Sequence, residues 1–415
     1  MYKKTVLDNS LRIVTERLPS RLVSIGIWVE IGSRDEDDCN NGTAHFVEHM
    51  FFKGTRLRSA QQIAKELDML GGMSNAFTSA EHTCFYLTVI DDRLGAAVEL
   101  LADLFLNSAF APEEIDRERQ VILQEIAMVE DTPDDLVHEM FSALYWRGHG
   151  LANPVLGRGE VVSALDCKRL TEFVRVNYRP ERIVIAAAGN VDHRSFAELC
   201  RNRFKMAPPA DERPPERRPP QPDSFGARRI VERSLEQAHT VMGTTGLPVD
   251  SPDRYKHLLL NSILGGNMSS RLFQEIREKR GLAYSVFSYL STNSDSGYTG
   301  IYLGVDPGSW TQAVELIHKE LAKLRLEGIT EAELAGAAEY ARGGIYLAAE
   351  NMEVRMVSLA KNEFSFGRYL SIEELTDAIA GVRREGINEL AGALFAEEHL
   401  PMCVVGPISA KLMNA

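Results

Sequence analysis

The sequence predicts an α+β fold of two homologous domains, each a mostly antiparallel β-sheet packed with helices, joined by a Pro-rich linker. Three observations support this prediction: a length of 415 residues, a Pro-rich stretch near the middle, and a repeated strand–helix pattern. A chain of this length exceeds what one hydrophobic core usually organises. We therefore predict a first domain over residues 1–206, a linker over 207–225 and a second domain over 226–415.

The predicted linker is the clearest break in composition along the chain. Its prolines are interleaved with Asp, Glu and Arg, and they are Pro208, Pro209, Pro214, Pro215, Pro219, Pro220 and Pro222. Proline has no backbone N–H group to donate in a helix or a sheet ladder. The segment is therefore expected to be extended and semi-rigid.

The two halves contain a short internal repeat. Residues 85–89 (FYLTV) are followed by residues 97–101 (AVELL), and residues 301–305 (IYLGV) are followed by residues 313–317 (AVELI), in both cases 216 positions later. In each copy a β-rich run leads through a polar turn into an amphipathic helix, which is a βα unit. The repeat predicts that one domain was duplicated.

Other elements follow from alternation and helical periodicity. Strands are predicted at residues 23–29 and from residue 240, and helices at 60–70, 93–106 and 112–128. Pro112 marks the start of the third helix, because proline has no donor to lose in the first turn.

The composition is that of an ordinary globular protein and excludes several functions. The net charge of −13 disfavours a general nucleic-acid or anionic-membrane binder. The five scattered cysteines suggest neither a disulfide framework nor a cysteine zinc site. No apolar run approaches the roughly 20 residues that span a bilayer, and we see no targeting leader, so we expect no membrane insertion and a cytoplasmic location.

The sharpest motif is HxxEH, formed by His45, Glu48 and His49. In a helix, the two histidines lie at i and i+4 on one face and can bind one zinc ion. Glu48 lies beside them and can act as a general base toward a water molecule at the metal. Because the flanking residues are strongly apolar, we expect this helix to be largely buried and its polar groups to need a partner.

A catalytic zinc site needs a third protein ligand from another element. The predicted helix over 112–128 offers Glu118 and Glu125, seven residues apart on one face. One carboxylate can ligate the metal while the other orients a histidine.

These motifs together resemble the pitrilysin and insulinase family of zinc metallopeptidases, and within it the mitochondrial processing peptidase and its bacterial relatives. The resemblance covers nearly the whole chain. Its matching segments are Gly42-Thr43-Ala44, the HxxEH motif, residues 50–55 (MFFKGT), 71–72 (GG), 75–83 (NAFTSAEHT), 118–125, 265–273 (GGNMSSRLF) and 277–285 (REKRGLAYS).

The resemblance implies one Zn²⁺ per chain and assigns the following roles: zinc ligands His45, His49 and Glu125, general base Glu48, and supporting carboxylates Glu118 and Glu81. It further implies roles for residues at the substrate: Arg277 and Tyr284 at the peptide and its oxyanion, Asn75, Ala76 and Phe77 as an edge strand that pairs with the substrate backbone, and Asp135 and Glu139 toward basic residues near the cut. From the local residues alone, the Asn75–Phe77 segment would be interpreted as a turn.

The second copy of the repeat does not carry the metal motif. At the offset of 216, Asn261, Leu264 and Gly265 stand opposite His45, Glu48 and His49. The resemblance implies one catalytic domain and one without ligands, and a second chain that completes an enclosed chamber, which we expect to be a homodimer.

We therefore predict a zinc metalloendopeptidase that hydrolyses peptides and unfolded segments, with Glu48 activating water. One alternative is a non-catalytic scaffold subunit of the same fold, and another is the active subunit of an obligate heterodimer. The complete metal motif argues against the first alternative, and the retained Arg277 and Tyr284 argue against the second.

Overall fold

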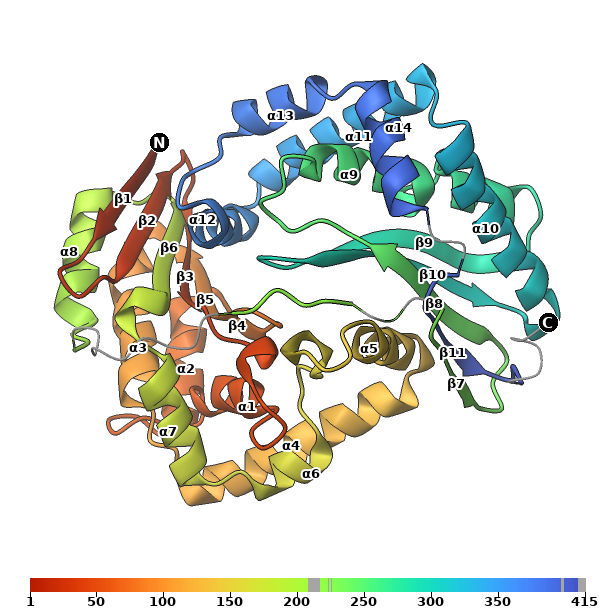
Figure 1. The fold of residues 1–415 in the computed structure, drawn as a ribbon. Helices are drawn as coiled ribbons and strands as arrows, with labels where there is room; N and C mark the ends of the chain where they lie inside the picture. The colour runs from red at the N-terminus through yellow and green to blue at the C-terminus, as the bar shows by residue number, and fades with distance from the viewer. Residues whose placement is uncertain (208–216, 223, 225, 397–398, 410–415) are drawn as a thin grey trace. The chain divides into compact units, whose positions relative to one another are not determined.

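The computed structural model describes residues 1–207, 217–222, 224, 226–396 and 399–409, and it contains two compact units (Figure 1). Unit 1 and unit 2 consist of these segments: Met1–Ala127, Asn153–Arg218 and Leu347–Leu370 in unit 1, and Met128–Ala152, Pro219–Tyr346 and Ser371–Ala415 in unit 2. The predicted halves run consecutively along the sequence, whereas the units exchange one segment each. Residues 208–216, 223 and 225 of the predicted linker lie outside the described part of the chain.

Unit 1 contains a six-stranded, mostly antiparallel sheet in the order β1-β2-β6-β3-β5-β4. Its strands are β1 (Tyr2–Val6), β2 (Arg12–Arg17), β3 (Leu22–Val29), β4 (Met73–Thr78), β5 (Thr83–Ile90) and β6 (Ile183–Gly189). Only β2 and β6 pair in parallel among these strands. The strand β4 therefore lies at one edge of the sheet.

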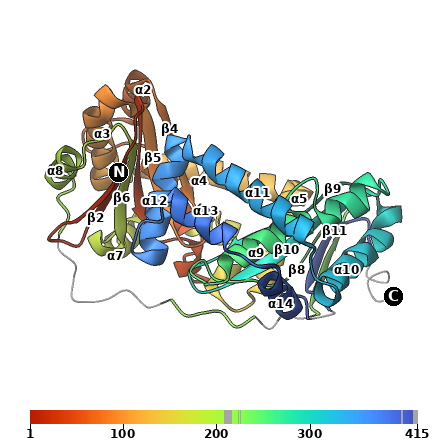
Figure 2. The same cartoon turned by 90° about the horizontal axis from the view of Figure 1, so that it is seen from above.

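Helices cover both faces of this sheet, and Figure 2 shows α3 and α8 on one face and α12 on the other. The helices of unit 1 are α1 (Thr43–Met50), α2 (Ala60–Leu70), α3 (Leu94–Asn107), most of α4 (Pro112–Asp131), α6 (Gly159–Ala164), α7 (Cys167–Asn177), α8 (His193–Arg203) and α12 (Met352–Phe366). The larger core of the unit lies between the sheet and the helices α1 and α3.

Unit 2 repeats this arrangement with five strands in the order β7-β11-β8-β10-β9. Its strands are β7 (Arg228–Glu232), β8 (Ala238–Thr245), β9 (Ala283–Thr292), β10 (Gly297–Val305) and β11 (Met402–Gly406). Its helices are α5 (Pro133–Tyr145), α9 (Arg254–Asn261), α10 (Trp310–Leu326), most of α11 (Glu331–Ala349), α13 (Ile372–Ala380) and α14 (Arg384–Leu394).

The two sheets confirm the prediction of two homologous domains. The order β2-β6-β3-β5-β4 in unit 1 corresponds strand for strand to β7-β11-β8-β10-β9 in unit 2, and β7 and β11 again form a parallel pair. The predicted repeat falls on β5 and α3 in the first copy and on β10 and α10 in the second. The helices predicted at 60–70, 93–106 and 112–128 are α2, α3 and α4.

Each exchanged helix packs on the central strand of its sheet at a glycine. In unit 1, α12 covers β3 at Gly26, and in unit 2, α5 covers β8 at Gly243. A Cβ atom on Gly26 would lie 2.5 Å from Met356 Sδ and 2.8 Å from Trp28 Nε1. The Trp28 indole also donates a hydrogen bond to Met356 Sδ over 3.2 Å. Close approach of the helix therefore requires glycine at this position.

We expect Gly26→Ala to lower the free energy of unfolding by about 1–3 kcal/mol, because an added methyl group overpacks a fully buried contact. Gly95→Ala is the matched control, since no heavy atom lies within 4 Å of a Cβ atom there. Denaturant unfolding of both variants measures the difference. Equal stability of the two variants would contradict the packing argument.

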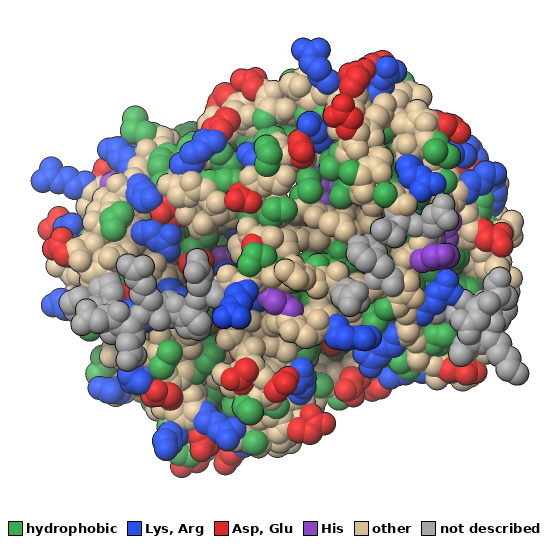
Figure 3. All heavy atoms as spheres, viewed as in Figure 1, with side chains coloured by type: hydrophobic (Ala, Val, Ile, Leu, Met, Phe, Trp, Pro, Cys, Tyr) green, Lys and Arg blue, Asp and Glu red, His purple; other side chains and the backbone are tan. Residues whose placement is uncertain are grey.

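On the face drawn in Figure 3, Lys and Arg side chains are interspersed with Asp and Glu side chains. Within the described residues, we find no helix that combines the length and the apolar character needed to cross a membrane.

Candidate functional site

The helix α1 carries the HxxEH motif, and its start is held by a buried carboxylate. Gly42 precedes the helix with a φ of 96°, a conformation that favours glycine. The Glu36 side chain accepts hydrogen bonds from the backbone N–H groups of Gly42 (2.8 Å) and Ala44 (2.6 Å). Burial raises the pKa of Glu36 to about 7, although these N–H partners act in the opposite direction. Glu36 thus supplies the cap that the glycine cannot provide.

Three ligand atoms converge between α1 and α4. Glu125 Oε2 lies 3.7 Å from His45 Nε2 and 3.5 Å from His49 Nε2. Among the described residues, these three side chains form one group whose ligand atoms lie within 4.8 Å of one another. A tetrahedral zinc ion with bonds of about 2.0–2.1 Å separates its ligand atoms by roughly 3.3–3.4 Å. The three residues therefore fit a zinc ion.

The pKa values of the two histidines shift in opposite directions. Burial, together with the neighbouring His49, lowers the pKa of His45 to about 3. His45 is therefore neutral at neutral pH, which is the form that ligates metals. Burial acts to lower the pKa of His49, but the carboxylates of Glu118, Glu125 and Glu48 raise it overall.

Glu118 orients the second histidine from behind. Its Oε2 atom lies 3.0 Å from His49 Nδ1, and its Oε1 atom lies 2.7 Å from Lys53 Nζ. With Nδ1 engaged by a carboxylate, Nε2 of His49 is the nitrogen that faces Glu125. Glu118 is buried, whereas the Glu125 side chain is 34% exposed.

Glu48 lies at the wall of a cavity beside the histidines. Burial raises the pKa of Glu48, and Glu125 adds to this, while a hydrogen bond from Thr78 and the charge of His49 lower it. The cavity has a volume of about 390 Å³ and is lined by Glu48, His49, Phe52, Lys53, Ser74, Asn75, Ala76, Glu118 and Val121. The site therefore combines a candidate metal centre, a carboxylate and space for a ligand.

Residues Asn75, Ala76 and Phe77 form part of the edge strand β4. The structure has a strand here, as the resemblance implies, and the turn favoured by the local residues is wrong. Asn75 and Ala76 line the cavity, whereas the Phe77 ring packs edge-on against Trp28, 5.3 Å away. Trp28 belongs to the apolar cluster under α12, so the Phe77 side chain lies on the sheet face opposite α1.

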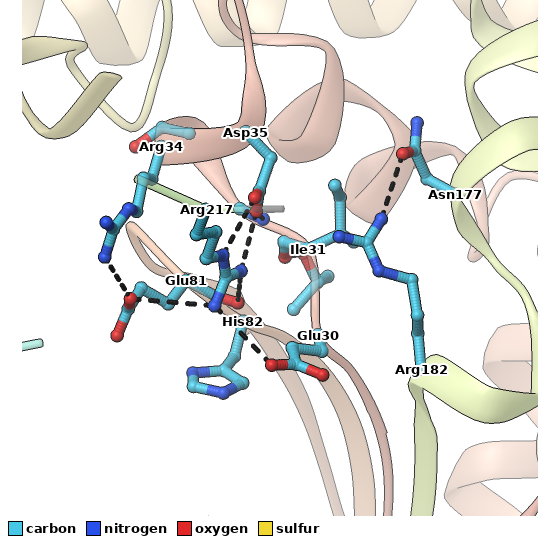
Figure 4. Close-up of polar contacts among 12 residues, drawn as sticks. Glu30, Ile31, Arg34, Asp35, Glu81, His82, Asn177, Arg182 and Arg217 are labelled. Carbon is cyan, nitrogen blue, oxygen red and sulfur yellow. Dashed lines mark hydrogen bonds and ion pairs between the residues drawn. The ribbon is translucent and has the colours of Figure 1, made fainter. Parts of the chain in front are cut away.

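Glu81 is part of an ion-pair network that includes the described end of the linker (Figure 4). Arg34 donates to its carboxylate over 2.7 Å, and Arg217 lies 3.6 Å from the same oxygen and donates to its backbone carbonyl over 2.9 Å. Arg217 also makes a bidentate pair with Asp35, at 2.9 and 2.7 Å. These contacts hold Glu81 in place, and its predicted support of the metal site stays a prediction.

We expect Arg217→Met to lower the free energy of unfolding by about 3 kcal/mol, because it removes the bidentate partner of Asp35 and leaves the buried Glu81 with Arg34 as its charged partner. The matched control is Arg203→Met, which removes a surface pair with Glu99 and should cost less than about 1 kcal/mol. Denaturant titration of both variants compares the two losses. A loss no larger than that of the control would contradict the importance of the network.

Four predicted residues belong to unit 2. Arg277 lies with its guanidinium carbon 4.7 Å from the ring centre of Tyr284, which is 77% exposed. Asp135 and Glu139 lie one turn apart on α5. Burial raises the pKa of Glu139, and the nearby Asp135 adds to this effect. Their contributions to the site in unit 1 stay predictions.

Sequence reasoning assigned no role to three residues that contact the site or the start of the helix α1 that carries it: Glu36, Lys53 and Thr78. Lys53 stands four residues after His49, a spacing that could have suggested it. Glu36 and Thr78 act through contacts between separate elements, and nothing in their local sequence indicates these contacts.

Comparisons with known proteins identify the family. The family model described as "Insulinase (Peptidase family M16)" matches residues 12–159, and the model described as "Peptidase M16 inactive domain" matches residues 164–340. A Bacillus subtilis protein named "Uncharacterized zinc protease YmxG" is 39% identical over 401 residues, covering 96% of this chain and 97% of that protein.

Two solved structures share the fold. The crystal structure of a protease from Helicobacter pylori has a TM-score of 0.90 at 21% identity, covering 98% of this chain and 99% of that one. A chain of complex III2 from Candida albicans has a TM-score of 0.84 at 21% identity, covering 98% and 96%. The family models, together with the Bacillus relative, confirm the resemblance seen in the sequence, and the chain belongs to the insulinase family, peptidase family M16.

Proposed function

We propose that this protein is a zinc metalloendopeptidase that hydrolyses peptides and unfolded segments. The observation that carries the proposal is the convergence of His45, His49 and Glu125 around one point, with Glu48 on the same helix. The names of the relatives support a zinc protease. We assign one Zn²⁺ per chain to the three converging residues.

The chemistry divides between the metal and the chain. When bound, zinc would polarise a peptide carbonyl and acidify a water molecule. Glu48 accepts the proton of the attacking water and returns it to the nitrogen of the leaving amine. Glu118 keeps His49 in the tautomer and orientation that its role requires.

The substrate binds by strand addition in this proposal. The backbone of Asn75 and Ala76 on the edge strand β4 pairs with an extended peptide, which tolerates many sequences. Arg277 and Tyr284 help to bind the peptide and to stabilise its oxyanion. Asp135 and Glu139 favour basic side chains near the cut, because carboxylates pair with guanidinium groups. A second copy of the chain completes the enclosure as a homodimer.

A structural subunit remains the alternative, since a chain of complex III2 has the same fold. The complete donor set argues against it, because a scaffold needs neither the two histidines nor the carboxylates of Glu48 and Glu125. An obligate heterodimer is the other alternative, and the purified chain distinguishes it from a homodimer.

The test is cleavage of short unstructured basic peptides by the chain purified alone, read by mass spectrometry alongside its zinc content and molar mass. We expect cleavage that a chelator abolishes and added zinc restores, and about one zinc per chain. A chain without zinc would favour the scaffold. A chain that holds zinc but cleaves nothing would favour the heterodimer.

A further inference from the structure

We propose that Thr78 is a positioning residue for Glu48, and that it ties the orientation of this carboxylate to the strand β4. The inference rests on the proposed function, because it assigns a role within the same site. It concerns residues of unit 1 alone.

The first observation is a direct hydrogen bond. Thr78 Oγ1 donates to Glu48 Oε2 over 2.6 Å. A glutamate side chain has three rotatable bonds, and a bond at one carboxylate oxygen restricts the conformations that all three can adopt. The bond engages Oε2, so Oε1 is the oxygen that we assign to the water molecule.

The second observation is that the backbone at Thr78 is fixed by its pairing with the neighbouring strand β5. It is the last residue of β4 and pairs with Thr83 at the start of β5. The turn that follows is closed by a hydrogen bond from Ser79 N–H to the carbonyl of His82, over 2.8 Å. Thr83 in turn donates to the carbonyl of Ile31 over 3.0 Å. The hydroxyl of Thr78 therefore starts from a fixed backbone.

The third observation is the division of β4 between the two faces of the sheet. Phe77 packs against Trp28 on the face opposite α1, and this contact holds the strand against the apolar cluster on that face. Side chains alternate along a strand, so Thr78 and Ala76 lie on the face of α1 and Glu48. A peptide paired with the outer edge of β4 would thus share one rigid strand with the group that orients the base.

The hydroxyl, and not the shape of the side chain, is the feature that matters in this proposal. Valine matches threonine in size and in strand preference but has no donor. Serine keeps the donor and loses only a methyl group. The pair of substitutions therefore separates hydrogen bonding from packing.

The experiment compares Thr78→Val and Thr78→Ser with wild type. Thr171→Val is the matched control, since that hydroxyl donates to the nearby backbone carbonyls of Cys167 and Lys168 on α7. We expect Thr78→Val to lower kcat roughly ten- to a hundredfold, the effect typical of a lost hydrogen bond to a charged group. KM, zinc content and the binding of a labelled peptide to the metal-free protein should stay at wild-type values. Thr78→Ser should restore most of the lost kcat.

A second arm places Thr78→Val in the Glu48→Gln background. If Thr78 acts through Glu48, the added substitution should change the residual rate by less than about twofold. Equal losses in the Val and Ser variants, a weakened peptide affinity, or an undiminished kcat in Thr78→Val would each overturn the inference. If wild type cleaves no peptide, it is the proposed function that fails, and the inference fails with it.

Discussion

Glu48→Gln is expected to lower kcat for peptide hydrolysis by roughly two to four orders of magnitude, the usual contribution of a general base. Glutamine has nearly the same shape but cannot accept a proton from water. The side chain remains able to accept the Thr78 hydrogen bond through its amide oxygen. Because His45, His49 and Glu125 are untouched, the variant should retain its zinc.

The measurement is kcat together with bound zinc, determined on the same preparations. Glu198→Gln is the matched control, because this carboxylate is exposed on α8 in unit 1 and should leave both quantities unchanged. A Glu48→Gln variant that cleaves at the wild-type rate would remove Glu48 from the mechanism. A variant that loses zinc as well would show that Glu48 belongs to the metal site instead.

The elements that carry the candidate metal site could be predicted from the sequence because their signals are local. The spacing of His45 and His49 fixes both rings on one face of a short helix, and Pro112 marks the start of the helix that carries Glu118 and Glu125. The spacing alone left open which of these two carboxylates ligates, and the resemblance to the family assigned this role to Glu125. The two carboxylates lie at different nitrogens of His49, since Glu118 contacts Nδ1 and Glu125 faces Nε2.

The exchange of α5 and α12 between the units could not be predicted, because no local pattern records it. Each helix has an apolar face that can cover a sheet, but the sequence pattern does not indicate which of the two sheets it covers. The decisive contacts are long-range, such as Trp28 with Met356 and Tyr86 with Glu353, which are 328 and 267 residues apart. The partners of Glu81 are hidden for the same reason, since Arg217 lies within the predicted linker.

Glu125→Gln and Glu118→Gln are expected to weaken zinc binding to very different extents. Both carboxylates lie on α4, seven residues apart, and both receive the same isosteric change. Loss of the His49 partner in Glu118→Gln should weaken zinc affinity by about 10- to 100-fold, as is typical when a group that orients a ligand is removed. Glu125→Gln replaces a charged ligand by a weak neutral one, so its zinc affinity should fall further, and with it the activity.

The measurement is a competition titration with a chromophoric zinc chelator, combined with the zinc content of each variant. Glu113→Gln, exposed in the first turn of the same helix, is the control and should bind zinc as wild type does. Full zinc occupancy in Glu125→Gln would exclude it as a ligand. The two roles are distinguished by the distances of Glu118 to Nδ1 of His49 (3.0 Å) and of Glu125 to Nε2 of His49 (3.5 Å). Equal losses of zinc affinity in the two variants would contradict this division of roles.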